Sequence, residues 1–430
     1  MRILLVNDGF GDAGGVQTYL DGVAGGLARR GHALAFLHRD LNPAPFAAAA
    51  TGRLPQFSVA HEGIERAIDR VAQWEPDVCF SHNMNLLDVD RALVGRWDVV
   101  KFMHGYFGTC IGAQKRHGFP VAAPCSRRFG PACLALYGPR HCGELRVGAF
   151  VRHYRWAREQ HNLLGRYRAI VVASEHMKRE FGWNGVPLSQ IHVNPLFPTH
   201  DWRPSGRRGR GAAPGRGPTG PPAAETAVGH SLSDRTAEAA AETDRAADGF
   251  AVAFMGRMTA LKGGDLLVRA MADAGARLGR TLTLVTIGDG PQRAAWERLA
   301  AECGVPCEGF GWLTGDARWT ALARASVLAV PSTWPEPFGL VGLEAAALGI
   351  PAIAFDVGGV REWLRPGSSG YLVPGDPPRA SAFADALVRA ASRPDDLAAM
   401  GRGASAVARE MSLDRHLDRL ETLLGDGATR

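Results

Sequence analysis

The stretch Pro335-Glu336-Pro337-Phe338-Gly339-Leu340-Val341-Gly342-Leu343-Glu344-Ala345 joins a proline-bounded loop to an apolar helix. Glu336 lies in the loop, and Glu344 lies about one and a half turns into the expected helix. A carboxylate among Val, Leu and Ala side chains costs free energy unless it has partners. Two kinds of partner are open for Glu344: the hydroxyl groups of a sugar or ribose, or an arginine of the same domain.

A second charged stretch, Gly256-Arg257-Met258-Thr259-Ala260-Leu261-Lys262-Gly263-Gly264, follows an expected strand and opens an expected helix. Arg257 and Lys262 flank this turn. Two cations that converge on one strand end suit a diphosphate, because arginine binds phosphate oxygens in pairs and lysine acts as a point charge. A pair of solvated surface cations is the alternative interpretation.

Short apolar runs alternate with helical patterns on both sides of these stretches. Strands are expected at 2–7, 33–38, 78–81, 99–103, 169–173, 251–255, 281–287, 327–330 and 352–355, and helices at 16–30, 64–74, 264–277, 292–303 and 339–348. This alternation is typical of parallel, doubly wound sheets, whose ligands bind where strands end and helices begin. The sequence therefore predicts two α/β domains in tandem, residues 1–200 and 250–410.

Residues 204–249 interrupt the alternation. They are dominated by Gly, Pro, Arg and Ala and show no apolar periodicity. Such a composition does not bury enough apolar surface to offset chain entropy. We interpret this segment as a disordered linker between the two domains.

The first βα turn contains a glycine pattern, Gly9-Phe10-Gly11-Asp12-Ala13-Gly14-Gly15-Val16, and Asp40 ends the second expected strand. The pattern matches G-x-G-x-x-G, so an NAD-dependent oxidoreductase is one interpretation. The match is weak, because glycine is abundant in this chain, with 53 residues. A turn that binds no ligand is another interpretation.

The composition is that of an ordinary globular protein, with 430 residues, 46% hydrophobic and 21% charged. It excludes a wholly disordered chain, a collagen-like fibre and a disulfide-dense miniprotein. No apolar run approaches the roughly 18 residues of a spanning helix. The apolar start Met1-Arg2-Ile3-Leu4-Leu5-Val6 is too short for a signal peptide, so we expect a cytoplasmic protein.

Positive charge gathers in the first domain, where residues 115–179 hold 13 basic and 3 acidic side chains. Such a patch attracts phosphates, nucleic acid or an anionic membrane surface. A solvated basic face is the alternative. We expect no nucleic-acid partner and a peripheral contact with the inner face of the membrane.

Four of the seven cysteines lie close together in the sequence, at Cys110, Cys125, Cys133 and Cys142, within a basic insert at about 105–150. Structural zinc, one or two disulfides, and reduced thiols are all open. The spacing lacks the C-x2-C pairs of most zinc ribbons. From spacing alone we expect less than one zinc ion per chain.

Taken together, these motifs resemble the retaining glycosyltransferases of family 4, which have the GT-B fold and a glycogen-synthase-like C-terminal domain. The resemblance rests on Glu336-x7-Glu344, G-R-x4-K-G at 256–263, Gly288-Asp289-Gly290-Pro291 and Gly358-Gly359-Val360-Arg361-Glu362, in order and at family-like spacing. Gly14-Gly15-Val16 and Lys101-Phe102-Met103-His104-Gly105 also look like that family. The resemblance covers both expected domains and omits the linker.

The resemblance implies an α/β fold of two Rossmann-like, doubly wound domains facing a cleft, with a C-terminal helix in 411–430 that crosses back to the first domain. It implies a role for each motif residue. Arg257 and Lys262 would bind the donor diphosphate, Glu344 the ribose, and Glu336 the donor sugar with the backbone of Phe338, Gly339 and Leu340. Gly14 and Gly15 would approach the phosphate, the loops around Gly288, Asp289, Gly290 and 309–312 would hold the base, and His104 would lie near the reacting centre, with Ser174 as a further candidate.

The implied reaction transfers a sugar from a UDP- or GDP-sugar to a hydroxyl acceptor, with retention and without a divalent metal or other cofactor. Asp88-Val89-Asp90 matches D-x-D, but we interpret it as the start of a helix rather than a metal site. The implied reaction fits the synthesis of cell-envelope polysaccharide or glycolipid and the glycosylation of natural products equally. The alternatives are the NAD-dependent oxidoreductase and a non-catalytic nucleotide-sugar-binding protein.

Overall fold

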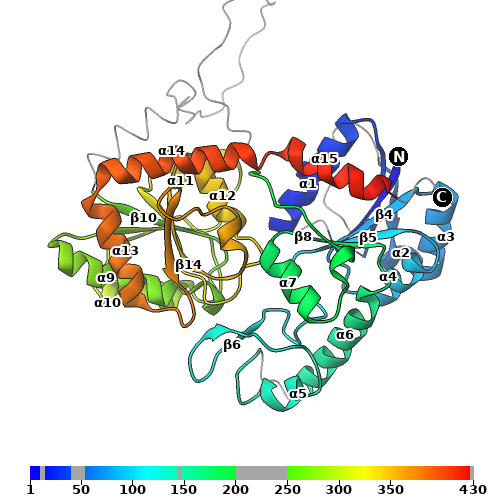
Figure 1. Cartoon of the computed structure of the whole chain (residues 1–430), viewed down its shortest axis with the longest axis horizontal. Coiled ribbons are helices and arrows are strands. Elements are labelled where there is room, and N and C mark those ends of the chain that lie inside the picture. Colours follow the sequence, from blue (N-terminus) through cyan, green and yellow to red (C-terminus); the bar gives the residue numbers. More distant parts are fainter. Residues whose placement is uncertain (10–14, 40–53, 144–147, 200–248, 427–430) are drawn as a thin grey trace, which may run out of the picture.

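The computed structural model describes residues 1–9, 15–39, 54–143, 148–199 and 249–426. Two parallel sheets, each flanked by helices, form two lobes that lie side by side in Figure 1. The described residues end with α15 lying against the first lobe. The α/β prediction is confirmed.

The first lobe is built on a seven-stranded sheet with the order β3-β2-β1-β4-β5-β8-β9, in which every pairing is parallel. Its strands are almost wholly apolar, because helices cover both faces of such a sheet. The strands are β1 (Arg2–Val6), β2 (Ala33–His38), β3 (Gln56–Ser58), β4 (Val78–Ser81), β5 (Val99–Met103), β8 (Ala169–Val172) and β9 (Ile191–Val193). The helices are α1 (Gly15–Arg29), α2 (Val59–Glu62), α3 (Ile64–Trp74), α4 (Leu87–Val94), α6 (Ala149–Leu164), α7 (Glu175–Trp183) and the 3-10 turn η2 (Leu188–Gln190).

The second lobe has a six-stranded parallel sheet with the order β12-β11-β10-β13-β14-β15. Its strands are β10 (Ala251–Met255), β11 (Thr283–Ile287), β12 (Cys307–Gly309), β13 (Val327–Val330), β14 (Ala352–Asp356) and β15 (Gly370–Pro374). Its helices are η3 (Ala260–Lys262), α9 (Gly264–Leu278), α10 (Arg293–Glu302), α11 (Gly315–Ala323), α12 (Leu340–Ala347), η4 (Gly358–Glu362), α13 (Ala380–Ser392) and α14 (Pro394–Glu410).

Each sheet reverses its strand order at one point, between β1 and β4 in the first lobe and between β10 and β13 in the second. In doubly wound sheets, ligands bind beyond the carboxyl ends of the strands at this reversal. The loops after β10 and β13 carry Arg257, Lys262 and Glu336. The sheet topology therefore places three of the candidate residues where a ligand is expected.

The last helix, α15 (Leu413–Gly425), follows α14 and lies beside α1 of the first lobe (Figure 1). Arg30 forms ion pairs with Asp414, Asp418 and Glu421 of α15. Leu417 packs where a side chain on Gly26 would stand, since a Cβ there would lie 2.4 Å from Leu417 Cδ1. The C-terminal end of the described chain is thus part of the first lobe.

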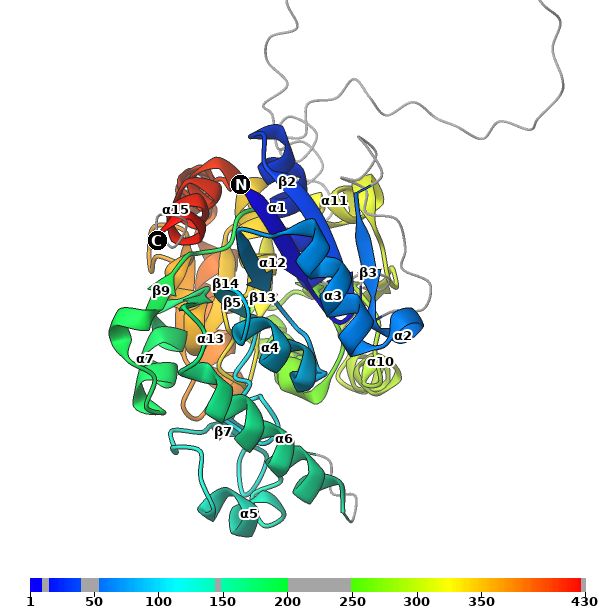
Figure 2. The same cartoon turned by 90° about the vertical axis from the view of Figure 1, so that its right-hand side faces the viewer.

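A loop-rich insert, with its described part at 105–143, projects from the first lobe (Figure 2). It holds the two-stranded hairpin β6 (Arg116–His117) and β7 (Ala123–Pro124) and the short helix α5 (Ala132–Tyr137).

The elements predicted from apolar periodicity are confirmed, with ends that shift by one or two residues. The strand expected at 281–287 begins at Thr283, and the helix expected at 339–348 runs from Leu340 to Ala347. Elements that periodicity did not reveal are short strands such as β3 and β9 or charged surface helices such as α6, α13 and α14. The predicted linker, 204–249, lies outside the described residues except for Gly249.

Candidate functional site

Glu336 and Lys262 form an ion pair at the carboxyl ends of β13 and β10. Lys262 Nζ lies 2.6 Å from Glu336 Oε1, and the glutamate is only 3% exposed. The same oxygen accepts hydrogen bonds from the Ser332 hydroxyl and from Trp334 Nε1. The second oxygen, Oε2, makes no hydrogen bond with the described residues. One carboxylate oxygen is thus fixed, and the other is available to a ligand.

Arg257 lies in the same loop as Lys262, after β10, but it has no such partner in the described part of the chain. It is exposed and makes no hydrogen bond or ion pair with the described residues. Its loop is nevertheless fixed, because Met258 N donates to Asp289 O at 2.8 Å and Thr333 N donates to Leu261 O at 2.8 Å. An arginine on a fixed loop can bind an anion with little loss of backbone conformational entropy.

Glu344 is buried within α12, and it has two partners. Thr199 Oγ1 donates to Glu344 Oε1 at 2.6 Å, and Arg318 Nη2 lies 3.3 Å from the same oxygen. Burial raises the pKa of Glu344, while Arg318 and the Thr199 hydrogen bond lower it. Of the two open partners, the arginine of the same domain is therefore present. Oε2 makes no hydrogen bond with the described residues, so a diol is still compatible.

The helix α12 begins directly after Gly339, which has a φ of +87°. No side chain caps its first backbone N–H groups. The Phe338 ring is buried, and its carbonyl oxygen accepts a 2.7 Å hydrogen bond from Trp363 Nε1. The N–H end of α12 thus follows Glu336 closely in the chain and suits an anion.

Gly288 and Gly290 are required by close backbone packing. A Cβ on Gly288 would lie 2.0 Å from Gly256 O, and one on Gly290 would lie 2.4 Å from Met258 O. Both have positive φ, +143° and +154°. Between them, the Asp289 side chain is exposed and lies 3.5 Å from Arg293 Nη1. The two glycines therefore hold the loops after β10 and β11 together.

His104 follows β5 and lies in a cluster of rings with Tyr19, His82, Phe102 and His416. Its Nε2 lies 3.0 Å from His82 Nδ1, and its ring stacks on Phe102 with 4.5 Å between centroids. Burial, with the charge of Lys101, lowers the pKa of His104 to about 3. The imidazole is thus neutral at neutral pH.

The His82–His104 contact indicates which nitrogen of His104 faces a ligand. His82 Nε2 is buried and has no hydrogen-bond partner. An orphaned acceptor costs less than an orphaned N–H, so we assign the proton of His82 to Nδ1, where it donates to His104 Nε2. His104 then carries its own proton on Nδ1, which makes no hydrogen bond with the described residues.

His416 connects α15 to this cluster. Its Nε2 lies 2.9 Å from the Tyr19 hydroxyl, and its Nδ1 lies 2.8 Å from Pro195 O. Burial lowers the pKa of His416 to about 4. The last helix therefore holds the ring cluster in place through a neutral imidazole.

Two contacts bring the lobes together near the candidate residues. Ser174 Oγ donates to Pro337 O at 2.7 Å, and Glu175 N donates to Glu362 Oε1 at 2.7 Å. Tyr106, two residues after His104, lies edge-on to Trp334 with 6.5 Å between ring centroids. The loop that carries His104 thus approaches the loop that carries Glu336, and Ser174 supports the contact.

The remaining predicted positions fall elsewhere. Gly14 and Asp40 lie outside the described residues, and Gly15 is the first residue of α1. Asp88 and Asp90 lie in the first turn of α4, as predicted, and Asp90 is fully buried 2.7 Å from Lys101 Nζ. Within the described part of the chain, no three His, Cys, Asp or Glu side chains are grouped closely enough to share a metal ion. None of the described helices is both long and apolar enough to cross a bilayer.

Sequence reasoning missed several residues that touch the candidate side chains: Thr199, Arg318, Ser332, Trp334, His82 and His416. His82 carried a signal, because it follows the buried strand β4 as His104 follows β5. Ser332 and Trp334 lie in the loop already singled out. Thr199, Arg318 and His416 come from distant segments, and nothing in their local sequence marks them.

The match to a family model falls mainly on the second lobe. Residues 236–407 match the model of a family described as glycosyl transferases group 1. A D-inositol 3-phosphate glycosyltransferase of Salinispora tropica is 38% identical over 190 residues, which cover 41% of this chain and 38% of the relative. One from Saccharomonospora viridis is 38% identical over 192 residues, covering 40% and 42%. The chain thus spans about two fifths of the length of these curated relatives.

The structural comparisons cover almost the whole chain. HepE of Anabaena, solved with UDP and glucose, aligns with a TM-score of 0.66 at 18% identity over 98% of this chain and 99% of that one. A glycosyltransferase of Rickettsia africae aligns with a TM-score of 0.69 at 15% identity over 100% and 99%. WaaG, involved in lipopolysaccharide biosynthesis, aligns with 0.65 at 15% over 99% and 100%. The GT-B prediction for the fold is confirmed.

Proposed function

We propose that this chain is a glycosyltransferase that moves a sugar from a nucleotide-diphosphate-sugar to a hydroxyl acceptor. The observation that carries the proposal is the Glu336–Lys262 pair at the strand reversal of the second lobe, in the loop that leads into the uncapped start of α12. This arrangement presents a cation, helix N–H groups and a free carboxylate oxygen at one place. It lies within the segment that matches the glycosyl transferases group 1.

The donor is assigned to the second lobe. Arg257, Lys262 and the start of α12 would hold the diphosphate, and Glu336 Oε2 would accept from sugar hydroxyls. Glu344 Oε2 would accept from the ribose, while its Oε1 stays with Thr199 and Arg318. The base would rest on the backbone of the loops at Gly288–Gly290 and 309–312. HepE was solved with UDP, which supports a uridine nucleotide for this chain.

The chemistry that we propose is transfer with retention, as in family 4. The bond between C1 of the sugar and the phosphate oxygen breaks, and a bond from the acceptor oxygen to C1 forms on the same face. The hydroxyl proton passes to the departing phosphate oxygen. Arg257, Lys262 and the helix N-terminus stabilise the charge that grows there, so these cations fill the role of a divalent metal.

His104 would act as a neutral donor rather than as an acid or base. With its pKa lowered to about 3, it holds no exchangeable positive charge at neutral pH. Its Nδ1–H would bind a hydroxyl of the donor sugar. Gly14 and Gly15 would approach the phosphate from the first lobe, as the family resemblance implies.

The acceptor side belongs to the first lobe, and α6 supports a membrane role there. Arg152, Arg155 and Arg158 recur every three residues on α6, are exposed and make no ion pair with the described residues. Such a basic face attracts anionic lipids. We propose peripheral contact with the cytoplasmic face of the membrane, in cell-envelope polysaccharide or glycolipid synthesis. Binding to phosphatidylglycerol vesicles tests the membrane contact separately. We expect the wild type to bind and an R152Q/R155Q/R158Q variant to lose this binding.

The NAD-dependent oxidoreductase has less support. Its motif residues from 10 to 14 and Asp40 lie outside the described residues, and it leaves the pair of Glu336 and Lys262 without a role. A non-catalytic sugar-nucleotide binder would use the same contacts but show no turnover.

A thermal-shift panel with UDP, GDP, ADP, dTDP and NAD tests the donor site. Glu344→Gln is the matched variant, because glutamine keeps the volume of the side chain and an oxygen for Thr199 and Arg318. We expect one nucleoside diphosphate to raise the Tm of the wild type and to raise that of the variant much less. Stabilisation by NAD that is equal in both proteins would contradict the proposal. Release of UDP or GDP from a sugar donor, with retained anomeric configuration by NMR, would then separate an enzyme from a binder.

A further inference from the structure

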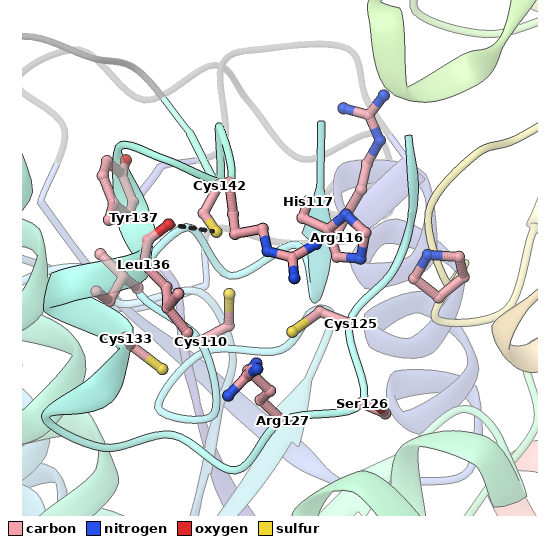
Figure 3. A pocket seen from close by; sticks show the side chains of 13 residues that line it. Cys110, Arg116, His117, Cys125, Ser126, Arg127, Cys133, Leu136, Tyr137 and Cys142 are labelled. Atoms are coloured by element: carbon pink, nitrogen blue, oxygen red, sulfur yellow. Dashed lines mark hydrogen bonds between the residues drawn. The ribbon is translucent and has the colours of Figure 1, made fainter. Parts of the chain in front are cut away.

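The four cysteines of the insert come from separate segments and line one pocket (Figure 3). Cys110 follows β5, Cys125 follows β7, Cys133 lies in α5, and Cys142 follows α5. The pocket has a volume of about 120 Å³. All four side chains are half-buried, and none is in a disulfide. The proposed transferase chemistry uses none of them.

The insert has little apolar surface to hold it together. Apart from Tyr106, which packs in the main hydrophobic core, its buried apolar side chains are Ile111, Ala123 and Tyr137, and these lie outside that core. Phe119 and Val121 are each 54% exposed. Lys115 and Phe129 attach the insert to Glu180 and Asn184 of the first lobe, and a loop-rich module with so small a core of its own gains stability from a covalent or metal cross-link. The thiols occupy the place where such a cross-link would act.

The charge around the thiols points to an anionic occupant. Arg116, Arg127 and Arg140 line the same pocket, and no Asp or Glu is among its lining residues in the described part of the chain. Arg116 Nε is buried without a hydrogen-bond partner. Arg127 is exposed, so the cost of desolvation falls on Arg116, whose buried Nε–H would be satisfied by a negative group in the pocket.

We propose that Cys110, Cys125, Cys133 and Cys142 bind one structural zinc ion. Binding replaces four S–H bonds with four Zn–S bonds and releases four protons, which leaves the centre with a charge of −2. The arginines around the pocket balance this charge. The sulfurs do not yet form a metal-binding group in this conformation, but rotation of χ1 between staggered wells moves a cysteine sulfur by roughly 3 Å.

This proposal reverses the expectation drawn from spacing alone. Spacing along the chain does not show where a loop returns, and the hairpin β6–β7 and α5 bring distant cysteines back to Cys110. It also differs from the disulfide alternative, because two disulfides would leave the buried Arg116 Nε–H without an anionic partner. The zinc would be structural, and the transfer chemistry would not use it.

The test is the zinc content of the full chain, purified under reducing conditions and analysed by mass spectrometry of the metal. We expect about one zinc per chain in the wild type and a clear loss in Cys125→Ser. Cys303→Ser, at the end of α10 in the second lobe, is the matched control and should keep its zinc. Replacement by Co²⁺ should give a thiolate-to-cobalt absorption band and tetrahedral d–d bands.

Zinc well below one per chain in the wild type, with no uptake of added Zn²⁺ or Co²⁺, would overturn the proposal even if Cys125→Ser does not fold. A mass two or four daltons below that of the reduced chain would overturn it in favour of disulfides. The result is separable from the proposed function, because nucleotide binding by the second lobe is measured independently.

Discussion

The two lobes hold their candidate residues by different means. In the second lobe the groups are charged and placed on loops joined by backbone hydrogen bonds, and Lys262 and Glu336 form an ion pair. In the first lobe, His104 lies in a packed ring cluster and is neutral. The contrast suits a donor whose phosphates carry charge and a sugar whose hydroxyls do not. The predictions below test that division, and each compares a residue of one lobe with a control.

The largest effect is expected at Lys262. Lys262→Ala removes the cation 2.6 Å from Glu336 and the counter-charge proposed for the phosphates. Losing one preorganised electrostatic group typically costs about 10²–10³-fold in rate. We expect a loss of that size in kcat/KM for the donor identified by thermal shift. Arg277→Ala on α9, which removes only exposed ion pairs with Asp273 and Asp385, is the control and should stay near wild type. A Lys262→Ala variant with nearly full activity would mean that charge in the second lobe is structural.

The contact between the lobes is tested by Gly359→Ala. A Cβ there would lie 2.4 Å from Pro337 O and 2.7 Å from Ser174 Cβ. Overpacking of this kind costs about 1–3 kcal/mol, so we expect a lower Tm and weaker turnover. In Gly165→Ala, whose new Cβ meets nothing within 4 Å, both should be unchanged. Equal behaviour of the two variants would show that the lobes do not need this close contact.

The same contrast determines what the sequence could predict. The candidate site of the second lobe was predictable from the sequence, because an anion site needs charges and glycines at fixed spacing, as in Arg257, Lys262 and Gly288. The ring cluster of the first lobe was not predictable, because its members meet only after folding. Tyr19 and His416, for example, are 397 positions apart in the sequence. Glu344 lies between these cases: its need for a partner was predictable, but Thr199 and Arg318 were not identifiable from local pattern.

A pH titration of stability tests the neutral cluster of the first lobe. The pKa of His416 falls from an ordinary value near 6.5 to about 4 in the folded chain. The unfolded chain therefore binds the extra proton between these values, so stability is full above about pH 6.5 and is lost as the pH falls toward 4. We expect His416→Gln to reduce the slope of unfolding free energy in this window by about 1.4 kcal/mol per pH unit. Urea unfolding at several pH values measures the slope, and identical slopes in both proteins would show that His416 is not held neutral.

The smallest effect is expected at Asp289, although it lies within a motif of the donor site. Its side chain is exposed and, among the described residues, contacts Gly290 N and Arg293, while its carbonyl oxygen accepts from Met258 N. Asp289→Asn keeps that carbonyl. We therefore expect its effect to be that of a surface substitution, within about 0.5 kcal/mol, and the Tm shift produced by the nucleotide should be nearly that of the wild type. Gly288→Ala is the counterpart, because its Cβ would lie 2.0 Å from Gly256 O and force the two loops apart. If Asp289→Asn weakened nucleotide binding as strongly as Gly288→Ala, the motif would act through its carboxylate. The second lobe would then bind the donor through side chains at the place where we assign backbone contacts.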